Sequence, residues 1–429
     1  VWTDISFCLD FKNKRIDAWV DGIKKVEILK SPIFFKPKEI YFKHGIYRSF
    51  ISRYKSRNNG TMPTQIVYYD EVRRGNSIEK VDVNINPKLK PVDWFNMKKL
   101  LGIVVLGLLL SGNAYSKTIV VKANPEKGFN FPYLLKTSKK TSDAKYLIVE
   151  SNNTGNGKSI KDMTSKAKKS LGWVLGSDIA KKLNFPLLMP VFPFATKEIE
   201  KDLPNLKWHY YFPQLDSDTI KIDNDKYKRI DLQLIAMIDD ARERLLKENN
   251  QSINEKVIFT GFSSSSLFAA RFTFLNPDRV SVAVGGGIGG LLPVPADKIN
   301  GIETIYPIGT YDFVKITGKK FNLEEYKNTP QFYWQGTKDK SNPFRKGAED
   351  LTDKEFGIVK KLFVDGLLFE SSPVSLEVNT VMWKNSQKYI NQIVDNVKFE
   401  SPKNLGHQVD NKMLLKSVKF IKENLWKNF

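Results

Sequence analysis

The distribution of apolar positions divides the chain into two unlike regions. Residues 1–96 contain short alternating runs with turn residues between them, and no helical period of any length. From residue 117 onward, short apolar runs typical of buried strands alternate with helical patterns. The first region is therefore predicted to be antiparallel β structure. The second is predicted to be an α/β domain, with a mostly parallel sheet and helices on both of its faces.

Six apolar, β-branched runs mark the predicted strands of the second region. They are residues 146–149, 187–191, 257–260, 280–284, 332–334 and 397–399. The clearest helix between them has apolar residues spaced four, three, one, three and four apart, namely Ile230, Leu234, Met237, Ile238, Ala241 and Leu245. This spacing places all six on one helix face. Asp240 and Arg244 are expected to form an i,i+4 pair on the other side of the helix.

In the first region, the strongest local signal is Asp21-Gly22 between two alternating runs at 15–20 and 23–29. An Asp-Gly pair in this setting predicts a β-hairpin with a two-residue turn. Further short strands are expected at 39–42 and 64–69. We therefore expect residues 1–96 to form part of a β-sandwich or jelly roll.

Residues 97–116, MKKLLGIVVLGLLLSGNAYS, have the pattern of a secretory signal peptide. Lys98 and Lys99 precede an apolar run over 100–110, and the small residues Ala114 and Ser116 occupy the −3 and −1 positions of a cleavage site. The apolar run is short for a membrane span, which needs about 20 residues. Residues 97–116 therefore predict export to the periplasm or the cell exterior, with no stable membrane anchor.

The position of this leader suggests how the chain is organised. Ninety-six residues precede it, and the chain begins at Val1. We expect residues 1–96 to be the tail of one protein, joined to a second precursor by gene fusion, read-through or an assembly artefact. The second part, from Lys117 onward, contains no cysteine, which suits an oxidising compartment.

Composition narrows the chemistry further. Cys8 is the only cysteine among 429 residues, which excludes an intrachain disulfide framework and a cysteine-rich metal site. The net charge of +21 divides into +7 for residues 1–96 and +14 for the rest, so the excess of lysine is spread through the chain. The lysines are not clustered with aromatic residues that could stack on bases, so nucleic acid is not an expected partner. A mechanism that needs imidazole has three candidates: His44, His209 and His407.

A candidate nucleophile follows the predicted strand at 257–260. The sequence VIFTGFSSSSLFAA contains Gly261-Phe262-Ser263 between an apolar strand and a helix, which is typical of a nucleophile elbow. Gly261 leaves room for the sharp turn, and Ser263 would stand at the carboxyl edge of the sheet. Ser265 replaces the second glycine of the Gly-x-Ser-x-Gly pattern. The alternative is that Ser264–Ser266 form an ordinary N-cap cluster.

The order of the chain selects the partners of Ser263. In hydrolases built on this elbow, the acid and then the histidine follow the serine. His209 precedes Ser263, whereas His407 follows the last predicted strand and is therefore the expected base. Asp339 follows the strand at 332–334 and is the expected acid, with Asp365 as a second candidate. Together these residues predict a Ser263–Asp339–His407 triad.

An oxyanion hole needs two backbone donors. The residue after the nucleophile, Ser264, is expected to supply one N–H group. The loop after the strand at 146–149 is expected to supply the other, from Asn152, Asn153 or Thr154. The glycine-rich run at 285–290 contains a Gly-x-Gly-x-x-Gly pattern, but prolines follow it where a nucleotide-binding helix would begin. We therefore expect a loop near the active site there, and no cofactor.

These motifs resemble secreted α/β-hydrolases of the polyhydroxyalkanoate-depolymerase-like and feruloyl-esterase-like kind. The resemblance covers most of residues 117–429 and is carried by the elbow, the Asn152–Gly155 loop and the segments 190–193, 231–234 and 237–242. It implies the α/β-hydrolase fold and serine-hydrolase chemistry on esters through an acyl-enzyme. It implies no bound cofactor or metal, and it does not fix the substrate.

Two strings of the first region, residues 41–48 and 63–73, resemble the C-terminal strands of jelly-roll polysaccharide lyases of the heparin-lyase and alginate-lyase type. Such enzymes cleave uronic-acid polymers by β-elimination. The resemblance implies that Lys43 and Tyr47 line a substrate groove, with Tyr47 as the acid/base. Two alternatives to the hydrolase thus stay open, a polyuronate-lyase fragment and a non-catalytic glycan-binding protein. An acidic or acylated polysaccharide, or a polyester, is the expected partner.

Overall fold

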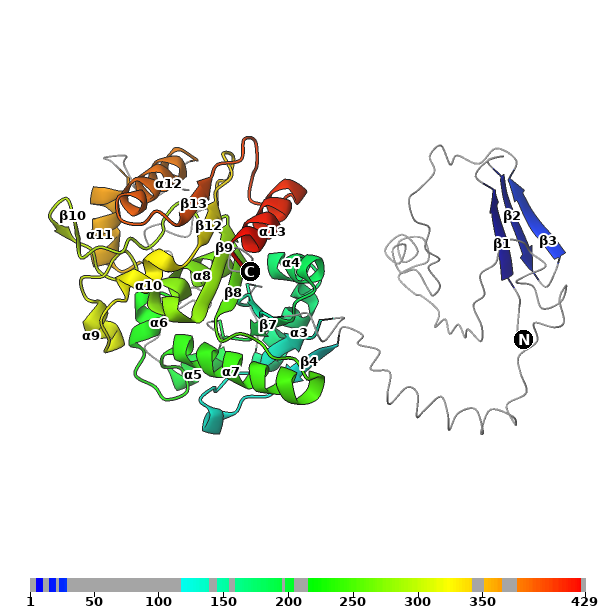
Figure 1. The fold of residues 1–429 in the computed structure, drawn as a ribbon, viewed down its shortest axis with the longest axis horizontal. Helices are drawn as coiled ribbons and strands as arrows, with labels where there is room; N and C mark the ends of the chain where they lie inside the picture. Colours follow the sequence, from blue (N-terminus) through cyan, green and yellow to red (C-terminus); the bar gives the residue numbers. More distant parts are fainter. Residues whose placement is uncertain are drawn as a thin grey trace. The chain divides into compact units, whose positions relative to one another are not determined.

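A computed structural model describes residues 5–10, 15–20, 23–28, 117–138, 145–153, 159–194, 197–203, 215–341, 351–364 and 376–425. The chain divides into two compact units, Val1–Gly112 and Asn113–Phe429 (Figure 1). The predicted leader at 97–116 lies outside the described residues. Within the described part of the chain, no helix combines the length and the apolar character that crossing a membrane requires.

The described part of the first unit is a three-stranded antiparallel sheet. Its strands are β1 (Ile5–Asp10), β2 (Arg15–Val20) and β3 (Ile23–Ile28), in that order. Val20 pairs with Ile23 across Asp21-Gly22, which confirms the predicted hairpin. The strands predicted at 39–42 and 64–69, and with them the jelly roll, lie outside the described residues.

The second unit is built on an eight-stranded mixed sheet. The strand order is β13-β12-β9-β8-β6-β7-β5-β4. The strands are β4 (Thr118–Val121), β5 (Tyr133–Lys136), β6 (Ile148–Val149), β7 (Leu187–Pro190), β8 (Val257–Phe262), β9 (Val280–Gly286), β12 (Gln331–Trp334) and β13 (Val397–Glu400). Every neighbouring pair from β13 to β7 is parallel, whereas the β5–β7 and β4–β5 pairs are antiparallel. A short hairpin, β10 (Lys298–Ile299) and β11 (Ile302–Glu303), stands apart from this sheet.

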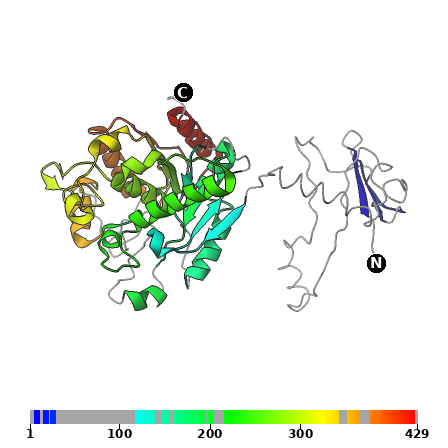
Figure 2. The same cartoon turned by 60° about the horizontal axis from the view of Figure 1, so that its bottom comes forward.

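Helices lie on both sides of the sheet (Figure 1, Figure 2). They are α3 (Ile160–Ser170), α4 (Leu175–Leu183), α5 (Lys197–Asp202), α6 (Ser217–Lys221), α7 (Ile230–Asn249), α8 (Ser264–Leu275), α9 (Phe313–Thr317), α10 (Leu323–Asn328), α11 (Asp353–Leu362), α12 (Leu376–Asn391) and α13 (Asn411–Leu425), with 3-10 turns at Pro125–Lys127 and Pro277–Arg279. The predicted strand–helix alternation and mostly parallel sheet are confirmed, and the architecture is consistent with the predicted α/β-hydrolase fold.

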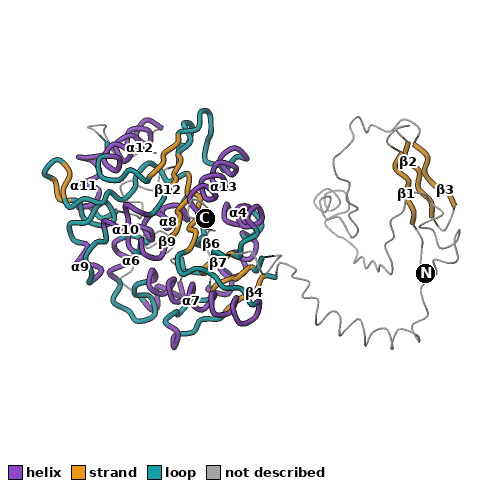
Figure 3. Tube along the Cα trace, in the orientation of Figure 1, coloured by secondary structure: helices purple, strands orange, loops and turns teal. Residues whose placement is uncertain are grey.

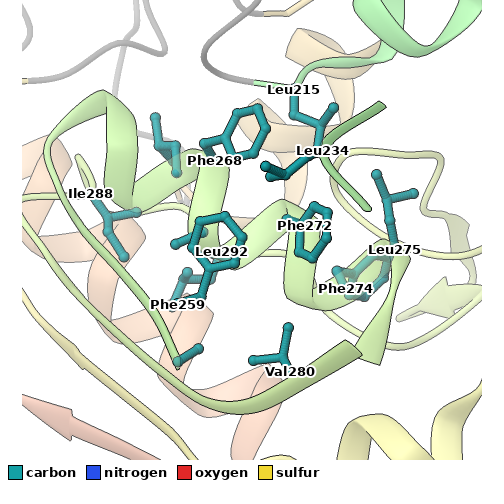
Figure 4. Close-up of a cluster of buried hydrophobic side chains, with 14 of the residues drawn as sticks. Leu215, Leu234, Phe259, Phe268, Phe272, Phe274, Leu275, Val280, Ile288 and Leu292 are labelled. Carbon is teal, nitrogen blue, oxygen red and sulfur yellow. The ribbon is translucent and has the colours of Figure 1, made fainter. Parts of the chain in front are cut away.

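Two apolar cores lie on opposite faces of this sheet. Along the central strand β8, Val257 and Phe259 belong to one core and Ile258 belongs to the other, as expected for a strand buried on both faces. Helices α7, α8 and α12 contribute side chains to the first core, and α3, α4 and α13 contribute to the second. Accordingly, α12 and α13 lie on opposite sides of β12 and β13 (Figure 3). Phe268 and Phe272 of α8 pack with Phe259 at the centre of the first core (Figure 4).

Two features differ from the sequence prediction. The edge strand β4 and its neighbour β5 were not predicted, although the residues of Thr118–Val121 are all β-branched. All six apolar residues of the predicted α7 face are buried, as expected, but Asp240, on the other side of the helix, is buried as well. Its carboxylate is buried and accepts hydrogen bonds from Tyr133 Oη at 2.6 Å, Lys127 Nζ at 2.7 Å and Arg244 Nε at 2.7 Å. The i,i+4 pair therefore exists, but it forms part of a buried polar contact between α7 and β5.

Candidate active site

The candidate site lies at the carboxyl edge of the parallel part of the sheet. Ser263 follows β8 directly, Asp339 lies in the segment after β12, and His407 lies in the segment after β13. Strands β8, β9, β12 and β13 run parallel to one another, so their carboxyl ends meet at one edge. This is the edge at which open α/β sheets bind ligands.

Ser263 has the backbone of a strained turn. Its φ is 62° and its ψ is −128°, which is an uncommon conformation for a residue with a side chain. Its N–H donates to Gly286 O at 2.9 Å, which fastens the turn to the end of β9. Ser263 occupies the N-cap position of α8, yet its side chain makes no capping hydrogen bond. Ser264–Ser266, which the sequence left open as an N-cap cluster, lie inside the first turn of α8 and do not precede it. The geometry thus favours the elbow.

Gly261 makes this turn sterically possible. A Cβ atom at this position would lie 2.3 Å from the backbone carbonyl of Ser265 and 2.5 Å from Ser266 N. Both neighbours are backbone atoms of α8, so no side-chain rotation could relieve the overlap. The close approach of the last residues of β8 to the first turn of α8 therefore requires glycine at position 261.

Asp339 and His407 are brought together across 68 residues of sequence. His407 Nδ1 lies 2.9 Å from Asp339 Oδ2 and 3.1 Å from Oδ1. The Asp339 side chain is fully buried, whereas the His407 side chain is 30% exposed. The Asp339 carboxylate also accepts the backbone N–H of Ser341 at 2.9 Å. The Nδ1 edge of the imidazole is thus held by a buried carboxylate, while the His407 side chain stays partly exposed.

The loops that carry these two residues are joined by hydrogen bonds. Thr337 N donates to Pro402 O at 3.1 Å, and Lys338 N donates to Leu405 O at 2.9 Å. Asn404 N donates to Thr337 Oγ1 at 2.9 Å. The residues in these bonds lie one to five positions from Asp339 or His407. They fix the spacing of the two loops, and hence the Asp339–His407 contact.

The His407 imidazole packs against Phe262 and Gly287, two residues beside the Ser263 turn. The rings of Phe262 and His407 are 4.8 Å apart between centroids. A Cβ atom added to Gly287 would lie 3.1 Å from His407 Cε1. Phe262 precedes Ser263 in the chain, and Gly287 follows the residue that accepts the Ser263 N–H bond. His407 is therefore packed at the turn that carries Ser263.

The residues predicted for the oxyanion hole differ from one another in their surroundings. Asn152 is buried, and its side chain forms two hydrogen bonds with the backbone of Phe192, at 2.9 and 3.0 Å. The Asn153 side chain donates to Phe262 O at 2.6 Å, which ties this loop to the elbow. Ser264 is the first residue of α8, where backbone N–H groups have no partner within the helix. Thr154 lies outside the described residues.

One polar residue of the site had no predicted role. Glu150 lies directly after β6 and its carboxyl group is fully buried. It accepts hydrogen bonds from Gly176 N at 2.5 Å and Thr260 Oγ1 at 3.1 Å, and it contacts Ser265 Oγ at 3.2 Å. Burial raises its pKa to about 7, although these hydrogen bonds act in the opposite direction. The sequence signal was a single carboxyl residue immediately after a buried strand and before the Asn152-Asn153 loop.

Other predicted residues cannot be compared with the structure. Lys43, His44, Tyr47, His209 and Asp365 lie outside the described residues. Among the residues that are described, no three His, Cys, Asp or Glu side chains are grouped so as to hold a metal ion.

Comparisons with known proteins give remote structural likenesses. The chain matches no protein-family model and no curated protein. Among solved structures it is similar to the poly(3-hydroxybutyrate) depolymerase LpqC from Bordetella parapertussis, with 10% identity, 75% of this chain and 93% of that chain covered, and a TM-score of 0.41. It is also similar to the naproxen esterase, carboxylesterase NP, from Bacillus subtilis, with 14% identity, coverages of 79% and 100%, and a TM-score of 0.34. A carboxylesterase from Bacillus cereus matches with 12% identity, coverages of 74% and 98%, and a TM-score of 0.33. At these scores the likenesses carry no argument about activity.

Proposed function

We propose that residues 117–429 are a serine hydrolase that cleaves ester bonds through Ser263, His407 and Asp339. The observation that carries the proposal is the buried Asp339 carboxylate, 2.9 Å from His407 Nδ1, with the imidazole packed at a strained Ser263 turn. The residue types, their chain order and their position at one sheet edge all agree with this chemistry.

In the proposed reaction, His407 acts first as a base. With Nδ1–H donating to Asp339, Nε2 carries no proton and takes the proton of the Ser263 hydroxyl. Ser263 Oγ then attacks the ester carbonyl, and the resulting imidazolium donates its proton to the departing alcohol. Water, activated in the same way, releases the acid from the acyl-enzyme. Throughout, Asp339 fixes the tautomer of His407 and stabilises its cation.

The developing oxyanion needs donors that are held in advance of the reaction. We propose the backbone N–H of Ser264, at the first turn of α8, as one of them. The second would come from the loop at 152–154. Two hydrogen bonds support this assignment. Asn152–Phe192 holds the loop against the segment after β7, and Asn153–Phe262 holds it against the end of β8.

The substrate is proposed by class only. An acylated polysaccharide or a polyester agrees with the hydrolase-like sequence motifs and with a lyase-like first region. The lyase and glycan-binding alternatives depend on residues outside the described part of the chain and stay predictions. We propose no nucleic-acid partner and no cofactor.

A fluorophosphonate probe tests the reaction class, because it phosphonylates an activated serine whatever the natural acyl group. The full chain is expected to be labelled, and Ser263→Ala is expected to abolish both labelling and hydrolysis of p-nitrophenyl acetate. Ser266→Ala is the matched control, since it removes a buried hydroxyl with no hydrogen-bond partner among the residues that the structure describes. Labelling that persists in Ser263→Ala, or that is lost equally in Ser266→Ala, would sink the assignment.

We also propose that the hydrolase is exported. The support is the leader pattern at 97–116, and the proposal is tested by producing residues 97–429 in a Gram-negative host. N-terminal sequencing of periplasmic protein is expected to begin at Lys117. A Leu106→Arg variant, which interrupts the apolar run, should retain the uncleaved form in the cytoplasm. Uncleaved protein in both cases would contradict export.

A further inference from the structure

Glu150 joins three separate elements beneath the nucleophile turn. Its Oε2 atom accepts the N–H of Gly176, at the start of α4, and the hydroxyl of Thr260 in β8. Its Oε1 atom faces Ser265 Oγ in the first turn of α8. A Cβ atom at Gly176 would lie 2.7 Å from Glu150 Oε2 and 2.6 Å from Thr260 Oγ1, so α4 can approach this closely only because position 176 is glycine.

Ser265 connects Glu150 to the residue before the nucleophile. Its hydroxyl oxygen accepts Phe262 N–H at 2.9 Å and also lies 2.9 Å from Phe262 O. Phe262 O accepts a second hydrogen bond from the side chain of Asn153 at 2.6 Å. A continuous set of hydrogen bonds therefore runs from Glu150 through Ser265 and Phe262 to the Asn153 loop.

A proton count shows that this set has two arrangements. A serine hydroxyl has one proton, so Ser265 donates either to Glu150 Oε1 or to Phe262 O. When Glu150 is ionised, its carboxylate accepts the hydrogen bond from the Ser265 hydroxyl, and Phe262 O keeps only the bond from Asn153. When Glu150 is neutral, its O–H donates to Ser265, and the Ser265 proton turns to Phe262 O. Only in the neutral arrangement does Ser265 hold both backbone groups of Phe262.

We propose that Glu150 is a positioning residue whose protonation sets how firmly Ser265 holds the nucleophile turn, with the neutral acid giving the more reactive Ser263. This inference rests on the proposed hydrolase function and adds a regulatory group to the same site. Glu150 acts through Ser265 and Phe262, and it is not assigned any contact with substrate.

The surroundings of Glu150 favour titration near neutrality. Its hydrogen-bond partners are the neutral groups of Gly176, Thr260 and Ser265, and the carboxylate of Asp178 in α4 further raises its pKa. Desolvation is the main cause, and together these effects raise the pKa to about 7. Both arrangements of the hydrogen bonds are therefore populated over the ordinary working range of an enzyme.

The test compares wild type with Glu150→Gln, measured as the second-order rate of fluorophosphonate labelling from pH 5 to pH 9. The glutamine amide donates to Ser265 as the neutral acid does, but it does not titrate. The ratio of wild-type to variant rates is expected to fall about fivefold with rising pH, with a midpoint near 7. The reason is that ionised Glu150 costs wild type about one hydrogen bond, from Ser265 to Phe262 O, which the variant keeps. Any pH dependence that is common to both proteins cancels in the ratio.

Two further variants make the result specific. In a Ser265→Ala background, adding Glu150→Gln should leave the ratio flat, because the connecting hydroxyl is gone. Asp216→Asn is the matched control: Asp216 is equally buried, its pKa is also raised to about 7 by desolvation, and its hydrogen bonds go to Thr219. Its ratio to wild type should also stay flat.

The outcomes separate this inference from the function on which it rests. A flat wild-type to Glu150→Gln ratio, in a protein that Ser263→Ala silences, would overturn the role of Glu150 and leave the hydrolase intact. A pH-dependent ratio that persists without Ser265 would overturn the route through that hydroxyl. Wild-type protein that is unlabelled at every pH, while circular dichroism shows it folded, would remove the proposed function and this inference together.

Discussion

Two buried carboxyl groups lie at the same edge of the sheet, and they differ in what faces them. Asp339 and Glu150 are both 1% exposed, and each follows a strand of the sheet. Asp339 faces an imidazole that can become a cation, whereas Glu150 faces a backbone N–H and two hydroxyl groups. A partner that can become a cation forms its stronger hydrogen bond with a carboxylate. Neutral partners can form hydrogen bonds with either the acid or the carboxylate of Glu150. The cost of burying a charge is therefore the larger effect, and it raises the pKa of Glu150.

Burial alone therefore does not define the role of an acid in such a site. Asp339 is suited to fix and charge-stabilise His407 during each turnover. Glu150 is suited to gain or lose a proton as the pH changes. The two residues should therefore respond in opposite ways to replacement by their amides.

The largest effect is expected for Asp339→Asn. The amide fits the same space, but it has no negative charge to stabilise the imidazolium. If its NH2 group faces Nδ1, it donates a hydrogen bond there and selects the wrong tautomer of His407. We expect kcat/KM for p-nitrophenyl acetate to fall about 10³–10⁴-fold. The melting temperature, followed by circular dichroism, serves as the control for folding. A loss below tenfold in a folded variant would mean that Asp339 is not the triad acid.

A smaller effect, on stability, is expected for Glu150. Its pKa is about 4.5 in the unfolded chain and about 7 when folded, so the folded state binds the proton more tightly. The stabilisation from Glu150 is complete below about pH 4.5 and is lost as the pH rises to about 7. Over this window wild type should lose about 3 kcal/mol of unfolding free energy relative to Glu150→Gln.

Urea unfolding of both proteins at several pH values measures this difference. Asp216, which is also buried with a raised pKa, contributes equally to both proteins and cancels in the comparison. Parallel stability curves from pH 4.5 to pH 8 would show that Glu150 does not titrate as proposed. Because unfolding requires no substrate, this measurement is independent of any hydrolytic activity.

Much of the site could be predicted because its signals are local or follow from chain order. Gly261 and Ser263 were identified by a short motif between a strand and a helix. His407 was selected because it is the histidine that follows both the elbow and the last strand. Asp339 followed from the same order, although the sequence left Asp365 as an alternative.

The rest depended on contacts that no local pattern encodes. The helical spacing placed Asp240 away from the apolar face of α7, but it did not show that Tyr133 and Lys127 reach Asp240 from more than 100 positions away. Ser265 looked like an imperfect substitute for glycine in the elbow motif. In the folded chain its hydroxyl is a hydrogen-bonding group, because Glu150 lies beside it.

The amino-acid sequence alone was enough to predict the alternation of strands and helices and the hairpin at Asp21-Gly22. It was also enough to propose the serine elbow and the order of the three expected catalytic residues. Hydrophobic periodicity, turn chemistry and chain order are properties of neighbouring or ordered residues, and they survive without coordinates. Only the tertiary structure decided that Asp339 reaches His407 and that Glu150 reaches Ser265. The first contact joins two loops 68 residues apart, and the second joins a loop to a helix 115 residues away. Burial, which raises the pKa of Glu150, is a property of the packed molecule alone.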